Sequence, residues 1–176
     1  LLGITISFGQ VGNMNGTTSG RFVKTALWAS SIATANTGVS NSTGVEALSY
    51  NPAGIIGNTQ LGFGSQESFG DIQTNFVGMT FDMEQSALGL LMMFNDVGDI
   101  EHTTWEDQDG VALGNFTVSQ MVFGLSYANQ ISDRIQTGLT LKAVHESALS
   151  IAATSFAVDL GIQYRFDKNL SIGLTL

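Results

Sequence analysis

From residue 59 onward, apolar and polar side chains alternate along the chain, and this period of two predicts β-strands. Between residues 117 and 131, one face of the predicted strand carries small or polar side chains, and the other carries Met121, Phe123, Leu125 and Tyr127. The same alternation runs through residues 135–142, 155–166 and 170–176. These segments predict a series of antiparallel strands joined by turns.

Three earlier segments predict further strands from a weaker pattern. Residues 61–64 alternate between apolar and small side chains. In residues 88–94 the alternate positions share an apolar face, but residues 91 and 93 place apolar side chains on the other face as well. In the segment 74–82, Phe76 is followed directly by Val77, so the pattern leaves the register of that strand open. In total we expect about seven strands.

The predicted connections differ in length between the two ends of the sheet. Short turns lie at residues 83–85, 132–134 and 167–169. Longer or looser loops lie at residues 68–71, 95–116 and 148–152. This contrast is typical of outer-membrane β-barrels, in which the short turns face the periplasm.

The side chains on the non-apolar face distinguish two all-β architectures. A soluble β-sandwich also has one apolar face per strand, and it stays open as an alternative. Here the other face is rich in Gly, Ser, Thr and Ala, with few of the Lys and Glu of a solvated sheet. Several strands are long enough to cross a membrane, and Tyr127, Tyr164 and Phe166 near the short turns fit an aromatic girdle. We therefore predict an antiparallel transmembrane β-barrel.

Composition and charge exclude several other classes. Charged residues make up 12% of the 176 residues, about half the share usual in soluble domains. The chain has 6 Lys and Arg and 15 Asp and Glu, and six basic residues are too few to contact the phosphates of a nucleic-acid duplex. The chain has no Cys, and therefore no disulfide or thiolate metal site. A hydrophobic share of 43% is too high for a disordered acidic chain, and no apolar run is long enough for a helical membrane span.

The two ends indicate a chain cut from a longer protein. We interpret residues 1–12 as the remnant of a signal peptide, with a short first strand as the alternative. Residues 13–57 form an N-terminal segment, and residues 58–176 form the barrel strands. Because the last residues stop inside an alternating run, we expect the barrel to be truncated there.

A specific motif surrounds the only proline. The stretch Ala47–Ile55 contains the box Asn51-Pro52-Ala53-Gly54, and Arg21-Phe22-Val23-Lys24 and a small-residue segment precede it. Later motifs follow in order, at Phe123–Tyr127, Ile131–Arg134, Gly138–Lys142, His145–Ser147 and Val158–Gly161. Over roughly residues 17–176, this arrangement resembles the PorV/PorQ family of outer-membrane proteins, which are FadL-like barrels. The resemblance implies a barrel of about fourteen strands, half of them in this chain, with an N-terminal segment inside the lumen.

The box has a structural and a functional interpretation, and both can hold. Asn-Pro starts a turn, because Pro fixes one φ angle and the following Gly releases another. The resemblance implies that Asn51, Pro52, Ala53 and Gly54 belong to a hatch, a plug that gates the passage of hydrophobic ligands. In that interpretation the Asn51 side chain ties the hatch to the barrel wall.

Four charged residues, Lys142, Glu146, Asp159 and Arg165, share the small-polar face of adjacent predicted strands. A charge that faces lipid costs several kcal/mol, so we expect these residues to face the lumen and to pair there. We predict a register that sets Lys142 opposite Asp159. The pair is either a structural ion pair or a contact for conducted ions or cargo.

Two further patterns test for a metal site and for catalysis. The segment 96–109 contains six acidic residues and no basic one, which predicts a solvated extracellular loop. Divalent-ion bridging, within the loop or to lipopolysaccharide, is the alternative, although the EF-hand pattern is absent. His145 and Glu146 are neighbours on a strand and point to opposite faces, and no nucleophile motif is present. We therefore expect no enzyme and no cofactor.

Three functional hypotheses follow, all in contact with membrane lipid and lipopolysaccharide and none with nucleic acid. The resemblance implies an outer-membrane protein of a Gram-negative bacterium that assists protein secretion of the type IX kind. Secreted cargo proteins or secretion-complex subunits would then be its partners. It equally implies passage of hydrophobic small molecules across that membrane. The third hypothesis is a small structural or adhesion barrel without transport, which uses part of residues 21–36 as an eighth strand.

Overall fold

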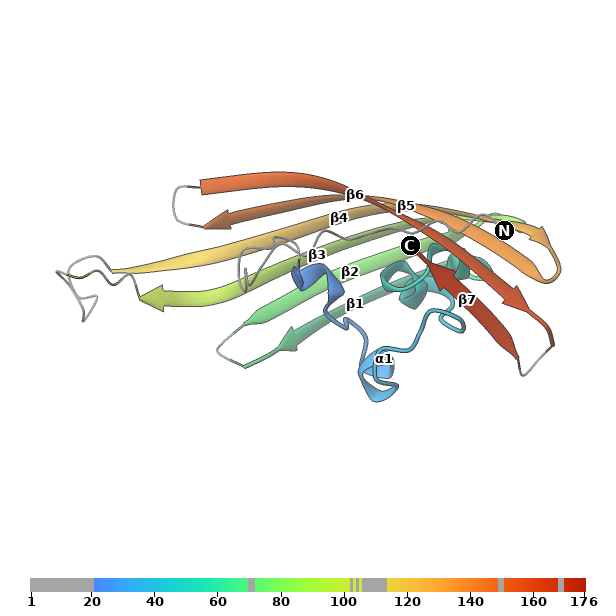
Figure 1. Cartoon of the computed structure of the whole chain (residues 1–176), viewed down its shortest axis with the longest axis horizontal. Coiled ribbons are helices and arrows are strands. Elements are labelled where there is room, and N and C mark those ends of the chain that lie inside the picture. Colours follow the sequence, from blue (N-terminus) through green and yellow to red (C-terminus); the bar gives the residue numbers. More distant parts are fainter. Residues whose placement is uncertain are drawn as a thin grey trace, which may run out of the picture.

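The computed structural model describes residues 21–69, 72–101, 103, 105, 114–148, 151–167 and 170–176, so residues 1–12 lie outside the described part. Seven antiparallel strands form one sheet in sequence order (Figure 1). They are β1 (Gln60–Glu67), β2 (Gln73–Asp82), β3 (Ser86–Glu101), β4 (Asn115–Ser132), β5 (Ile135–Ala148), β6 (Ile151–Arg165) and β7 (Ser171–Thr175). The all-β, antiparallel architecture predicted from the period of two is confirmed.

The N-terminal segment, described from residue 21 to residue 57, forms short helical turns. They are η1 (Arg21–Lys24), α1 (Ala29–Ala33), η2 (Gly44–Ser49) and η3 (Pro52–Ile55). The eighth strand proposed within residues 21–36 is wrong, because η1 and α1 lie in that range. Asn51 begins η3: its Oδ1 accepts a hydrogen bond from the Ala53 backbone N at 3.1 Å, and Pro52 fixes the first helical φ angle.

A helix with the length and apolar character of a membrane span does not occur in the described part of the chain.

The two faces of the sheet differ in chemistry. We call the face that packs against η2 and η3 the inner face, and the opposite one the outer face (Figure 1). The inner face carries mostly small and polar side chains, of which Thr80, Ser126 and Thr140 are almost completely buried, together with several buried apolar side chains. The outer face carries large apolar side chains that stay exposed, among them Leu61, Phe63, Val77, Leu88, Met92, Phe94, Met121, Phe123, Leu125, Leu141, Val158 and Leu160. A water-soluble sheet has the reverse arrangement, with its apolar face buried.

The structure settles the register of β2, which the sequence left open. Phe76 faces inward and is 7% exposed, whereas Val77 is exposed on the outer face. The Phe76 ring packs edge-on against Trp28, with 4.8 Å between the ring centroids. Gly64 lies directly opposite Phe76 on β1, where a Cβ atom would lie only 2.5 Å from the ring. The missing side chain of Gly64 therefore makes room for an aromatic ring on the inner face.

The apolar core lies between the N-terminal segment and the inner face. Leu48 of η2 and Ile55 of η3 are 2% and 0% exposed, and they cluster with Leu91 and Val122 of the sheet. Burying an aliphatic side chain stabilises a fold by about 1.5–3 kcal/mol. The N-terminal segment is therefore an integral part of the fold.

The connections match the predicted turns at one end of the sheet and depart from them at the other. Residues 83–85, 133–134 and 166–170 join strand pairs at the short-turn end. The loop predicted at 148–152 is wrong, because Ala148 pairs with Ile151 and residues 149–150 alone join β5 to β6. That stretch contains none of the Gly, Pro, Asn or Asp residues that interrupt strands, which agrees with β5 extending to Ala148 and β6 beginning at Ile151.

The loop predicted at 95–116 is also shorter than expected. β3 continues to Glu101 and β4 begins at Asn115, with a shift in the pairing between Asp96 and Asp99. These ends extend beyond the residues of β2 and β5 that pair with them. We call the paired residues 99–101 and 115–117 the β3–β4 ribbon.

Candidate functional site

The box residue Asn51 ties the N-terminal segment to the sheet. Its side chain is fully buried, and its Nδ2 donates hydrogen bonds to the carbonyl oxygens of Ile162 on β6, at 3.1 Å, and Leu174 on β7, at 3.4 Å. A further bond of 2.8 Å runs to the carbonyl oxygen of Val39 within the segment. Because a buried amide without partners is costly, these contacts favour one seated position of η3.

Two glycines of the sheet receive the box. A Cβ atom on Gly138 of β5 would lie 2.3 Å from the carbonyl carbon of Pro52, and one on Gly161 of β6 would lie 2.0 Å from Asn51 Oδ1. Gly138 and Gly161 are directly opposite each other in the sheet. By contrast, a Cβ atom on Gly124 of β4 would meet nothing closer than 3.6 Å. The close approach of η3 therefore depends on two particular glycines.

The remaining box residues are buried beside an amide that the sequence analysis missed. Ala53 and Gly54 are buried in η3, and a Cβ atom on Gly54 would lie 2.2 Å from the carbonyl oxygen of Ser42. Gln163 of β6 is 5% exposed, and its Nε2 donates to the carbonyl oxygens of Ser42, at 3.2 Å, and Val39, at 3.3 Å. The sequence offered only a weak indication of Gln163, because it is a long amide side chain on a strand face that otherwise carries mostly small residues.

Two more hydrogen bonds hold the segment along the first strands. The backbone N of Val45 in η2 donates to Gln60 Oε1 at 3.0 Å, and Thr80 Oγ1 donates to the carbonyl oxygen of Asn58 at 2.9 Å. Polar groups of β1, β2 and β6 and backbone carbonyls of β6 and β7 thus all contact the segment or its end. Its position is set across the width of the sheet.

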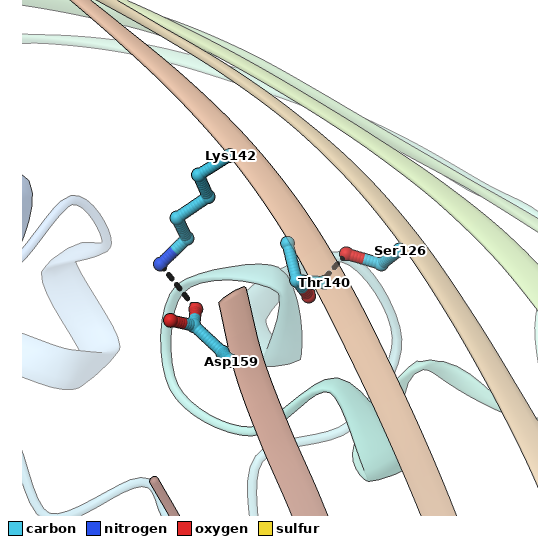
Figure 2. A network of polar contacts seen from close by, with 4 residues as sticks. All are labelled: Ser126, Thr140, Lys142 and Asp159. Carbon is cyan, nitrogen blue, oxygen red and sulfur yellow. Dashed lines mark hydrogen bonds and ion pairs between the residues drawn. The ribbon is translucent and has the colours of Figure 1, made fainter. Parts of the chain in front are cut away.

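Lys142 and Asp159 form an ion pair on the inner face (Figure 2). Lys142 Nζ lies 2.5 Å from Asp159 Oδ2, and the two side chains are 10% and 28% exposed. The predicted register is wrong, because Asp159 is opposite Thr140 and Lys142 is opposite Ala157. The pair is diagonal, since a long Lys side chain reaches across to the neighbouring residue pair. Beside it, the hydroxyl groups of Thr140 and Ser126 are 2.7 Å apart.

Glu146 belongs to a row of hydrogen bonds across four strands. Thr74 Oγ1 donates to Asn95 Oδ1 at 2.6 Å, and Asn95 Nδ2 donates to Gln120 Oε1 at 2.8 Å. Gln120 Nε2 then donates to Glu146 Oε1 at 3.0 Å. Successive members are direct cross-strand partners, and all the donors point toward the carboxylate. This row of hydrogen bonds was not predicted from the sequence, because residue 95 belonged to a predicted loop and the register of the segment with residue 74 was open.

Arg165, the fourth predicted inner-face charge, lines a cavity instead of joining the ion pair. The cavity has a volume of about 400 Å³ and lies between the N-terminal segment and the short-turn end of the sheet. Arg134 lines it from the turn between β4 and β5, Gln163 lines it from β6, and Asn41 lines it from the segment. Arg165 forms no ion pair with a described residue.

His145 and Glu146 lie on opposite faces of β5. His145 is exposed on the outer face, where its Nδ1 lies 2.9 Å from Thr154 Oγ1, whereas Glu146 contacts Gln120 on the inner face. The two side chains therefore cannot act on one substrate. Within the described residues, no cluster of three or more His, Asp or Glu side chains has the arrangement of a metal site.

The acidic segment is divided between a strand and undescribed residues. Asp96, Asp99 and Glu101 lie in β3, so this part of the segment is strand and not the predicted loop. Asp99 Oδ1 accepts a hydrogen bond from Thr117 Oγ1 at 3.2 Å within the β3–β4 ribbon. Three further acids, Glu106, Asp107 and Asp109, lie outside the described residues.

Comparisons with known proteins provide no relative. No protein-family model, no curated protein and no solved structure matches the chain. Two features of the structure therefore bear on function: the outer face is apolar and exposed, and the inner face, with mostly small and polar side chains, is covered by a segment of the same chain.

Proposed function

We propose that this chain forms wall and hatch of an outer-membrane β-barrel of the PorV/FadL type in a Gram-negative bacterium. The exposed apolar outer face is the observation that carries this proposal. In water, such a large contiguous apolar surface favours association, whereas in a membrane the lipid chains cover it. The residues 21–57 that cover the inner face are then the hatch, and the inner face is the lumen wall.

Strand length and charge placement support the same proposal. β4 has 18 residues, which span about 60 Å at roughly 3.3 Å per residue. A tilted membrane strand needs only about 9–11 residues. The paired charges Lys142 and Asp159 lie on the inner face, away from the surface that would meet lipid. Tyr127 and Tyr164 near the short-turn end have the position of an interfacial girdle.

A cysteine scan along β4 tests the orientation of the two faces. The chain has no native Cys, so single Cys variants at positions 121, 123 and 125 can be compared with matched variants at 122, 124 and 126. Each is labelled with a small fluorophore in lipid vesicles that contain a quencher on the acyl chains. We expect quenching at the odd positions and little at the even ones. A soluble sandwich would instead bury the odd positions under a second layer, without quenching.

We further propose that hydrophobic compounds pass the hatch. Phe22, Val23 and Trp28 of the hatch pack against an apolar cluster to which both the hatch and the inner wall contribute, the wall with residues such as Phe76 and Val122. This part of the interface between hatch and wall is therefore apolar on both sides. A shift of this part of the hatch would expose an apolar path along the wall.

A reversible lock on the hatch tests this activity. A Cβ atom on Gly78 would lie 2.8 Å from Val45 Cγ2, so the side chains of Cys residues at positions 45 and 78 would be in direct contact, as a disulfide between them requires. We expect oxidised V45C/G78C to take up a labelled long-chain fatty acid at least about tenfold more slowly than the reduced form. The single variant V45C is the control. Equal uptake by the oxidised and reduced forms would overturn hatch-gated passage.

The β3–β4 ribbon favours assistance to protein secretion as a second candidate function. Asp99 and Glu101 make it acidic, and it extends beyond the neighbouring strands at the end opposite the short turns. A projecting ribbon presents polar side chains to a partner protein. The variant D99K/E101K should lose co-purification with secretion subunits and cargo, while fatty-acid uptake is unchanged. Glu67→Lys, at the same end of β1, is the control, and retained co-purification in D99K/E101K would eliminate this candidate.

A further inference from the structure

The polar cavity at the short-turn end is not used by either proposed activity. Its volume is about 400 Å³, and every residue that lines it has a polar side chain. Ser40, Asn41 and Thr43 contribute to it from the hatch, and Gln136 and Gln163 contribute from β5 and β6. A lining of this kind suits a small polar molecule and not a hydrophobic cargo.

Two neighbouring arginines supply positive charge to this cavity. Arg134 lies in the turn between β4 and β5, Arg165 ends β6, and the Arg165 backbone N donates to the Arg134 carbonyl oxygen at 2.8 Å. Neither arginine forms an ion pair with a described residue, and among the described residues that line the cavity Asp133 is the only acid. Two like charges on neighbouring segments repel each other, and a bound anion would offset that repulsion.

We propose that this cavity binds a small phosphate-bearing molecule between the guanidinium groups of Arg134 and Arg165. The planar guanidinium donates paired hydrogen bonds that match phosphate oxygens. Gln163 forms a rigid part of the lining, because it is 5% exposed and its hydrogen bonds to Val39 and Ser42 hold it in place. Asn41 and Thr43 face the same space from the hatch, so the ligand contacts hatch and wall together.

The phosphate group has two possible sources, a free phosphoester and a phospholipid headgroup. Calorimetric titration of the purified intact protein in detergent separates them with two probes. Glycerol phosphate represents the free source, and dihexanoyl phosphatidylglycerol represents the headgroup. Saturable binding of the first probe assigns a free ligand, and binding of the second alone assigns a headgroup. Absence of saturable binding by both probes overturns the proposal.

Variants test whether the two arginines carry the binding. R134Q/R165Q should weaken binding by at least about tenfold, because charge-assisted hydrogen bonds to both guanidinium groups are lost. Lys24→Gln removes one positive charge from η1, which contributes no described residue to the cavity, and it should retain wild-type affinity. If R134Q/R165Q does not fold, R134K/R165K keeps the charge and loses the planar donors, and its affinity should fall several-fold. Wild-type affinity in the folded arginine variants would overturn the assignment.

Discussion

At the scale of single residues, Asn51 shows how one buried amide positions a segment. Its Nδ2 faces three carbonyl oxygens, and its Oδ1 accepts the bond that begins η3. Only a side chain with a donor on one side and an acceptor on the other fits this site. Asp has the same shape, but it would place an oxygen where the three carbonyls require a donor.

We predict that Asn51→Asp destabilises the protein by at least about 3 kcal/mol, because it leaves a buried carboxylate facing carbonyl oxygens. Urea titration of the protein in lipid vesicles measures the loss in the free energy of unfolding. Asn58→Asp is the matched control, since Asn58 is exposed and contacts Thr80 only through its backbone. Equal stability of the two variants would contradict the role assigned to Asn51.

The ion pair leads to a second prediction at this scale. Lys142→Met should reduce stability by about 1–3 kcal/mol, because Asp159 then remains on the inner face without its partner. Adding Asp159→Asn should recover part of that loss, since the unpaired charge is removed. The coupling between the two changes is obtained from a double-mutant cycle of urea titrations. Strict additivity would mean that the 2.5 Å contact contributes nothing.

The residues of the candidate site were easier to predict from the sequence than the contacts that those residues make. The box was predicted from its resemblance to a family motif and from its turn chemistry, and the pair Lys142–Asp159 was predicted from charge and strand face. The partners of Gln163 were not found, because they are backbone carbonyls about 120 residues away, and a two-residue period carries no information on contacts across such a separation.

At the scale of elements, glycines decide where the hatch approaches the wall. Gly138 and Gly161 form a directly opposed pair under the box, whereas Gly124 on β4 lies away from it. All three are glycines on the same face of long strands, so the sequence pattern alone does not distinguish them. The difference lies in what packs against each one.

This difference predicts contrasting effects of one substitution. Gly138→Ala should destabilise the seated hatch by about 1–3 kcal/mol, because the new Cβ atom overlaps the Pro52 backbone. Gly124→Ala should be neutral or slightly stabilising, since its Cβ atom meets only ordinary contacts and Ala is the better strand residue. Limited proteolysis within residues 21–57 measures hatch opening. Faster cleavage in both variants would show that the glycines are not specific contacts.

The lengths of the connections were the least predictable elements. The segment 148–152 was expected to be a longer or looser loop between two alternating segments, yet Ala148 pairs with Ile151. Weak alternation therefore does not indicate a loop when residues that break strands are absent. The acidic residues 96–101 were misassigned for a related reason: charge suggested solvent, and a strand that extends beyond its neighbours is solvated on both faces.

At the scale of the whole molecule, the sheet buries the face with most of its polar and small side chains and exposes the face with most of its large apolar ones. The period of two predicted which side chains share a face of the sheet. It did not predict which of the two faces is covered. The structure shows that residues 21–57 cover the polar face (Figure 1). The proposed membrane location depends on what covers the outer face. The most direct test is therefore the loss of stability when a charge is placed on that face.

We predict that Leu125→Arg destabilises the protein by about 2–4 kcal/mol in lipid vesicles, because the charge would lie in the middle of the lipid-facing surface. Leu125 is already 45% exposed, so in a water-soluble sheet with this face open the same change would have little effect. Gln73→Arg is the control, since Gln73 is exposed on the same face at the end of β2 and should tolerate the charge to within about 1 kcal/mol. Urea titration in vesicles of short-chain and long-chain lipid then gives the dependence on membrane thickness. A cost at Leu125 that equals the cost at Gln73 in both lipids would show that no lipid contacts the outer face.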